Sequence, residues 1–98
     1  MERQSDSVLK TLAARRTELE SHGVRSLLLF GSTARNQATS DSDVDLIVEF
    51  DRPVGFFALT RLQVDLEHWL GRPVDLLTAD ALRPELRERV LREALRAA

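Results

Sequence analysis

The segment Gly31-Ser32-Thr33-Ala34-Arg35 is followed by Ser42-Asp43-Val44-Asp45-Leu46, and these two stretches decide the fold. Together they place a Gly-Ser turn before two carboxylates that are one residue apart. Because side chains alternate along a strand, Asp43 and Asp45 would project from the same face. Carboxylates this close repel each other unless a cation lies between them, and Mg2+ prefers oxygen ligands. The spacing therefore predicts a site for Mg2+ and for the phosphates that it carries.

Three apolar segments predict strands, from Val24 to Phe30, from Val44 to about Phe50 and from Pro73 to Leu77. The first contains a continuous apolar run, which is typical of a strand buried on both faces. The second alternates between apolar and acidic side chains, so one face would be core and the other would carry the acids. The side chains expected on its core face are Val44, Leu46, Val48 and Phe50.

The third strand adds another acidic side chain. Val74 and Leu76 would face the core, so Asp75 would project from the opposite face. Asp43 and Asp45 occupy the same kind of position on the second strand. We therefore expect Asp75 to join the pair.

Apolar residues at helical spacing predict three helices. The first spans Ser5 to about His22. The second lies between Gly55 and Gly71, and its apolar side comprises Phe56, Leu59, Leu62, Leu66, Trp69 and Leu70. The last opens near Asp80, or at Pro84, and continues to the C-terminus with the stripe Leu82, Leu86, Val90, Leu91 and Leu95. Between the first two strands, the small polar segment from Ser32 to Ser42 predicts a short helical turn followed by a loop.

The alternation of helices and strands predicts one α/β (α+β) domain over residues 1–98, with a small mixed β-sheet and helices packed on one face. Cysteine is absent, which excludes disulfides and thiolate metal sites. The net charge of −2 mixes both signs, so no broad footprint for nucleic acid is expected. Since no apolar run approaches the roughly 20 residues of a membrane span and the N-terminus lacks a signal sequence, we expect a cytoplasmic protein without a membrane partner.

The sequence excludes two other motifs, an EF-hand calcium loop and a Walker-type phosphate loop. Aspartates at every second position from 41 to 45 have the spacing of an EF-hand calcium loop, but Leu46 stands where that loop needs glycine. Arg52 stands where the calcium loop needs a bidentate glutamate. A Walker-type loop is excluded because its glycines and its Lys-Ser/Thr pair do not follow Gly31.

The Gly-Ser and Asp-x-Asp segments together resemble the active-site signature of the minimal nucleotidyltransferases (MNT), a family of the DNA polymerase β superfamily. Two later segments, Gly71 to Leu76 and Leu86 to Ala94, are similar to the matching parts of that family. Many relatives have glycine after the arginine, where this chain has Asn36. Asparagine tolerates positive φ better than most residues, so the difference is minor.

The resemblance implies a polymerase β-type nucleotidyltransferase fold and a set of site residues. Its catalytic and metal-binding residues would be Asp43, Asp45 and Asp75, which would hold one or two Mg2+ ions and the triphosphate of ATP. Its nucleotide-binding residues would be Gly31, Ser32, Arg35 and Ser42. Two roles stay open, because Arg35 could be structural and Ser42 could brace the loop that presents Asp43.

The resemblance also implies a partner. Free-standing relatives accompany HEPN-domain ribonuclease toxins, so the chain resembles an MntA-like antitoxin that transfers AMP from Mg-ATP to a tyrosine hydroxyl of the toxin. One alternative is a stoichiometric binding antitoxin with a vestigial nucleotide site. Another is a transferase for a small-molecule or RNA acceptor. The arginines of the last helix do not favour RNA, because Glu85 with Arg89 and Glu88 with Arg92 form favourable pairs of a solvated face.

Overall fold

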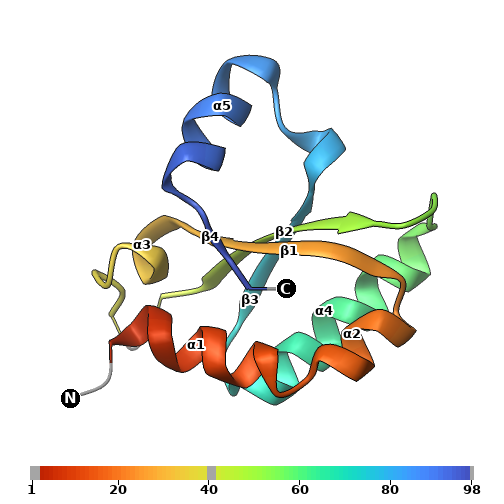
Figure 1. Cartoon of the computed structure of the whole chain (residues 1–98), viewed down its shortest axis with the longest axis horizontal. Helices are drawn as coiled ribbons and strands as arrows, with labels where there is room; N and C mark the ends of the chain where they lie inside the picture. Colours follow the sequence, from red (N-terminus) through yellow and green to blue (C-terminus); the bar gives the residue numbers. More distant parts are fainter. Residues whose placement is uncertain (1–2, 40–41, 98) are drawn as a thin grey trace.

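The computed structural model describes residues 3–39 and 42–97 (Figure 1). Residues 40 and 41, which belong to the predicted loop and include Asp41 of the calcium-like spacing, lie outside this description. The elements in chain order are α1 (Gln4–Ala13), α2 (Arg16–Ser21), β1 (Val24–Phe30), α3 (Gly31–Ala34), β2 (Val44–Phe50), α4 (Phe56–Leu70), β3 (Val74–Thr78), the short 3-10 helix η1 (Ala79–Ala81), α5 (Pro84–Glu93) and β4 (Leu95–Arg96).

The four strands form one mixed sheet in the order β3-β2-β1-β4. β1 is antiparallel to both β2 and β4, whereas β2 and β3 are parallel. In this register Asp45 pairs with Phe30 on one side and with Asp75 on the other. The prediction of a small mixed sheet is confirmed, and the register places two of the predicted acids on directly opposed positions.

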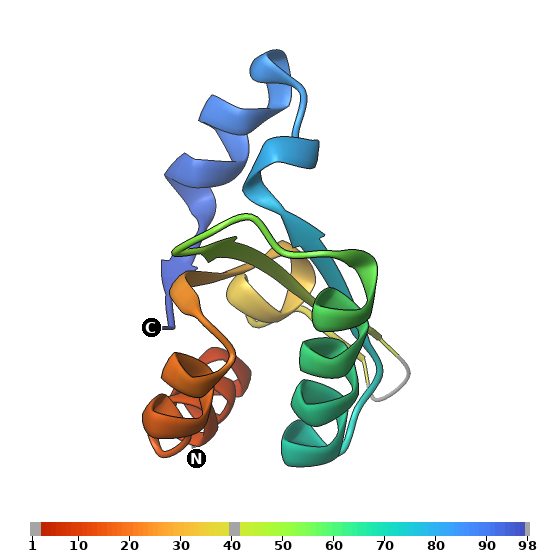
Figure 2. The same ribbon diagram turned by 90° about the vertical axis from the view of Figure 1, so that its right-hand side faces the viewer.

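The core lies between this sheet and the helices α1, α2 and α4. Figure 2 shows these three helices on one side of the sheet and α5 on the other. The residues predicted to face the core from β2 and β3 are buried, at Val44, Leu46, Val48, Val74 and Leu76, and Phe50 packs partly against them. Ile47 is also buried, although it points to the same face of β2 as the acids. This face is therefore shielded from solvent at Ile47, between Asp45 and Glu49.

The prediction of a single first helix is wrong. The chain turns at Ala14 and Arg15, where the Arg15 N–H bonds to the Leu12 carbonyl at 3.0 Å, and α2 then starts at Arg16. Periodicity cannot detect this break, because Leu12 and Leu19 are two helical turns apart and both are buried. The turn brings the Arg15 guanidinium to 5.4 Å from the Trp69 ring, a contact with α4 that the local sequence does not reveal.

The prediction that the last helix continues to the C-terminus is also wrong. Its start at Pro84 is confirmed, but α5 ends at Glu93 because Ala94 has an extended backbone. β4 then pairs with β1 at Leu28 and Leu29 and covers an edge that would otherwise be unpaired. The predicted apolar stripe does not pack into the core, since α5 contains no buried residue and Leu86 and Leu91 are 49% and 44% exposed.

The bounds of the middle helix are confirmed, because α4 runs from Phe56 to Leu70 and Gly71 ends it at φ 67°. Its buried side is correct at Leu62 and Leu66. Phe56 is the exception, since it is 75% exposed, and its ring lies edge-on to the Phe57 ring at a centroid distance of 6.1 Å. Among the described residues, no helix is long and apolar enough to cross a membrane.

Two substitutions on α4 test the assignment of the core. Leu66 is fully buried, so Leu66→Ala should lower the free energy of unfolding by about 2–5 kcal/mol. Val64, two residues earlier and 56% exposed, is the matched control. Val64→Ala should change the free energy of unfolding by about 0.5 kcal/mol or less. Urea denaturation measures both. Equal losses for the two variants would contradict the packing described here.

Candidate active site

Gly31 lies close to the Asp45 carboxylate. β1 ends at Phe30, and the chain turns directly into α3 with Gly31 at φ 72°, a conformation that favours glycine. A Cβ placed on Gly31 would overlap the Oδ2 atom of Asp45 and would lie 3.1 Å from its Cγ. The glycine therefore lets the Asp45 carboxylate lie directly against the backbone of the turn.

Asp45 has two acidic neighbours and one basic neighbour. Burial raises the pKa of the Asp45 carboxyl group, and the negative charges of Asp75 and Asp43 raise it further, while the positive charge of Arg35 lowers it. Asp45 is partly buried, whereas Asp43 and Asp75 are exposed. The structure thus brings the three predicted carboxylates and Arg35 into one electrostatic environment.

The raised pKa gives a testable dependence of stability on pH. The folded state disfavours the ionised Asp45 above its raised pKa, and this penalty disappears as the pH falls below the ordinary value of 3.8. In EDTA, Asp45→Asn should therefore be more stable than the wild type at neutral pH, and the difference should shrink towards zero below pH 3.8. Urea denaturation at both pH values measures this. A less stable Asp45→Asn protein at neutral pH would contradict the electrostatic description.

The three carboxylates offer only oxygen ligands, which suits Mg2+. Within residues 3–39 and 42–97, no group of three or more His, Cys, Asp or Glu side chains is arranged as a preformed metal site. Such a cage is not needed for Mg2+, which is usually bound by one or two carboxylates together with water and substrate phosphates. The mutual repulsion at Asp45 also favours a cation. The donor set therefore fits Mg2+ that is bound together with a nucleotide.

Ser42 braces the loop in front of Asp43. Its Oγ accepts a hydrogen bond from the Thr39 N–H at 2.9 Å and lies 3.0 Å from the Thr39 hydroxyl. Its own N–H donates to the Thr39 carbonyl at 3.1 Å. Through these contacts Ser42 braces the loop, which is one of the two roles expected for it. Nucleotide binding by Ser42 stays a prediction.

Ser32 and Arg35 belong to the turn that begins at Gly31. The Ser32 carbonyl accepts a hydrogen bond from the Gln37 N–H at 2.8 Å, which folds the chain back after α3. The Arg35 guanidinium lies 3.8 Å from a carboxylate oxygen of Glu93 and donates to the Gln37 side chain at 3.3 Å. Arg35 lines a cavity of about 260 Å³ between the end of β1 and α5, together with Phe30, Gly31, Leu86, Arg89, Val90 and Glu93. The nucleotide-binding roles of Ser32 and Arg35 stay predictions.

The start of α1 holds the same loop through contacts that no sequence pattern indicates. The Gln4 side chain makes two hydrogen bonds to the backbone of Ala38, at 2.7 and 3.0 Å. The side-chain Oδ1 of Asn36 accepts hydrogen bonds from the Ser5 N–H and from the Ser5 hydroxyl, each at 3.0 Å. Asn36 has φ 59°, a left-handed backbone that asparagine tolerates better than most residues, so the prediction that it can stand at this position is confirmed. These contacts link residues more than thirty positions apart, so local patterns cannot reveal them.

Two substitutions separate the functions of Asn36. Asn36→Gly keeps the backbone angle and removes the acceptor for Ser5, so it should lower stability by about 1 kcal/mol. Asn36→Ala adds the strain of a left-handed backbone and should lower it by about 1–2 kcal/mol more. Thermal or urea unfolding shows which of the two variants is less stable. An Asn36→Ala protein as stable as Asn36→Gly would show that the backbone angle is unimportant.

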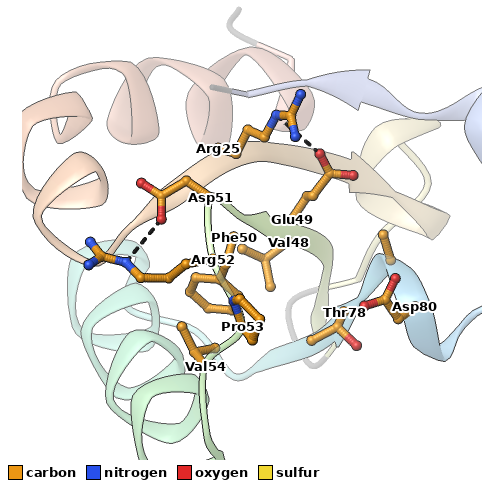
Figure 3. Close-up of a pocket in the computed structure, with 11 residues that line it drawn as sticks. Arg25, Val48, Glu49, Phe50, Asp51, Arg52, Pro53, Val54, Thr78 and Asp80 are labelled. Atoms are coloured by element: carbon orange, nitrogen blue, oxygen red, sulfur yellow. Dashed lines mark hydrogen bonds and ion pairs between the residues drawn. The ribbon is translucent and has the colours of Figure 1, made fainter.

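Another cavity lies away from these acids. Figure 3 shows this cavity of about 550 Å³ where β2 and β3 end, at the opposite end of β2 from Asp45. Its two arginines already form ion pairs there, Arg25 with Glu49 at 3.5 Å and Arg52 with Asp51 at 3.2 Å. None of the predicted site residues lines it.

The chain is similar to several known proteins. Residues 9–97 match the family model of the nucleotidyltransferase domain. The protein adenylyltransferase MntA of Thermococcus cleftensis is 36% identical over 91 residues, which cover 92% of each chain. A solved structure of a predicted minimal nucleotidyltransferase is 43% identical, with a TM-score of 0.76 and coverage of 89% of this chain and 93% of that chain.

The chain belongs to the nucleotidyltransferase domain family, and it is a nucleotidyltransferase. The resemblance to the minimal nucleotidyltransferases and the polymerase β-type fold are thus confirmed. A solved complex of a tri-AMPylated Shewanella oneidensis HEPN toxin with an MNT antitoxin has a TM-score of 0.67 at 18% identity and covers 93% of this chain and 71% of that chain. At this identity the likeness shows the fold alone.

Proposed function

We propose that this chain is an adenylyltransferase antitoxin that transfers AMP from Mg-ATP to a tyrosine hydroxyl of a HEPN ribonuclease toxin. The observation that carries the proposal is the contact of the Asp45 carboxylate with the Gly31 turn, in register with Asp75. The similarity to the adenylyltransferase MntA supports AMP as the group that is transferred. The AMPylated HEPN toxin in the structural neighbour supports a HEPN toxin as the acceptor. The chain itself has no tyrosine, so it cannot modify itself on that side chain.

Asp43, Asp45 and Asp75 would hold Mg2+, which when bound neutralises phosphate charge and stabilises the leaving pyrophosphate. Gly31 presents backbone without a side chain to the outer phosphates, and the Ser32 hydroxyl lies beside it in the sequence. Asp75 is exposed beside Asp45, where it can align the incoming hydroxyl and accept its proton. The bond between the tyrosine oxygen and the α-phosphorus forms as the α–β phosphoanhydride bond breaks.

Intact mass of the toxin tests the proposal. Incubation of the chain with Mg-ATP and its HEPN partner should add one or more AMP units to the partner, and peptide mapping should place them on tyrosine. Asp43→Asn and Asp45→Asn should each lower the transfer rate by about 100-fold or more, because each removes a charge that would hold the cation. Chelation of divalent cations by EDTA should stop transfer by the wild type.

Glu49→Gln is the matched control. Glu49 is also a carboxylate on β2, but it pairs with Arg25 beside the distant cavity, so its variant should keep the transfer rate. A toxin that is inhibited without any added AMP, equally by the wild type and by Asp45→Asn, would overturn the proposal and favour a stoichiometric binding antitoxin. AMP found on a small molecule or an RNA end, and not on the toxin, would overturn the choice of acceptor.

A further inference from the structure

Arg72 contacts the loop in front of Asp43 through its guanidinium group. Its Nη2 donates to the Ser42 carbonyl at 2.6 Å and approaches the Thr39 carbonyl at 3.4 Å. Ser42 directly precedes Asp43, so one guanidinium nitrogen contacts the backbone next to a predicted catalytic residue. The same two residues are already tied to each other through the Ser42 hydroxyl. Arg72 therefore holds a loop that has its own internal bracing.

The place of Arg72 in the chain fixes it with respect to the sheet. It lies between Gly71, which ends α4, and Pro73, whose carbonyl accepts the Val44 N–H at 2.9 Å. That bond joins the first residue of β2 to the start of β3. Arg72 and Pro73 thus hold the residues on both sides of Asp43, one through a side chain and the other through the backbone.

The arginine is not explained by stability alone. Its Nε is buried and has no hydrogen-bond partner among the described residues, and a buried donor without a partner is unfavourable. Arg72 lines a cavity of about 300 Å³ with Gln4, which holds Ala38 of the same loop. An apolar side chain of similar length could fill this space without leaving a donor unpaired. What it could not do is hold the Ser42 and Thr39 carbonyls.

We propose that Arg72 is a positioning residue for nucleotidyl transfer, which fixes the Asp43 carboxylate through the carbonyls of Thr39 and Ser42. The planar guanidinium can present one nitrogen to two carbonyls, whereas a lysine ammonium is a point charge on a flexible stem. Arg72 touches neither substrate nor metal in this proposal. It acts only through the loop, and its kinetic effect rests on the transferase function proposed above.

The test compares Arg72→Met, Arg72→Lys and Arg61→Met in the full chain. Arg72→Met should lower kcat for AMP transfer by about 100-fold, since displacement of a reacting group by about 1 Å has effects of this size. Hydrogen exchange of the Ser42 amide should accelerate by about tenfold or more, while the amides of Leu27 and Leu29 in β1 should keep their rates. Arg72→Lys should have a kcat and a Ser42 exchange rate between those of Arg72→Met and the wild type. Arg61 is exposed on α4, so Arg61→Met should change neither quantity.

The exchange measurement separates failure of this inference from failure of the proposed function. If the wild type transfers no AMP, faster exchange confined to the loop in Arg72→Met still supports the positioning role. Unchanged loop exchange overturns that role, whatever the activity. Equal acceleration in the loop and in β1 overturns it too, because Arg72 would then stabilise the whole fold. Should Arg72→Met fail to fold, Arg72→Lys decides by the same criteria.

Discussion

The contact between the Gly31 backbone and the Asp45 carboxylate is the constraint on which the site depends. β1 and β2 pair up to Phe30 and Asp45, and the chain must turn into α3 immediately afterwards. A side chain at Gly31 would occupy the position of the Asp45 carboxylate. Displacing this carboxylate would separate the turn that is expected to hold phosphates from the acids that are expected to hold Mg2+. The glycine therefore joins two halves of the site that come from different strands.

The parts of the structure that follow from short-range patterns could be predicted. Alternation along β2 correctly placed its core face, and the single acidic residue in an apolar segment correctly placed Asp75 beside Asp45. Gly71 correctly marked the end of α4, because a left-handed residue ends a helix. The backbone of Asn36 could also be anticipated, since few residues other than glycine tolerate φ 59°.

Contacts between distant residues could not be predicted in this way. The turn at Ala14 and Arg15 keeps the helical phase of the leucines on either side, so the periodicity looks unbroken. The apolar pattern predicts helix at β4, because its leucine continues the stripe of α5, whereas in the fold β4 pairs with β1. The support of the loop by Gln4 and by Arg72 leaves no mark in the sequence, since amide and guanidinium side chains are usual on any surface. Such support can be recognised only when the partners are seen together.

The parallel pairing of Asp45 with Asp75 limits how the chain can change in length. Neighbouring residues of a strand point to opposite faces, so shifting β3 by one position would turn its acid towards the core and bring an aliphatic residue into its place. The short connection from Leu70 to Val74 sets that alignment. Insertions and deletions should therefore be rejected there during evolution, while the exposed turn around Pro53 and Gly55 can accept them without disturbing the acids.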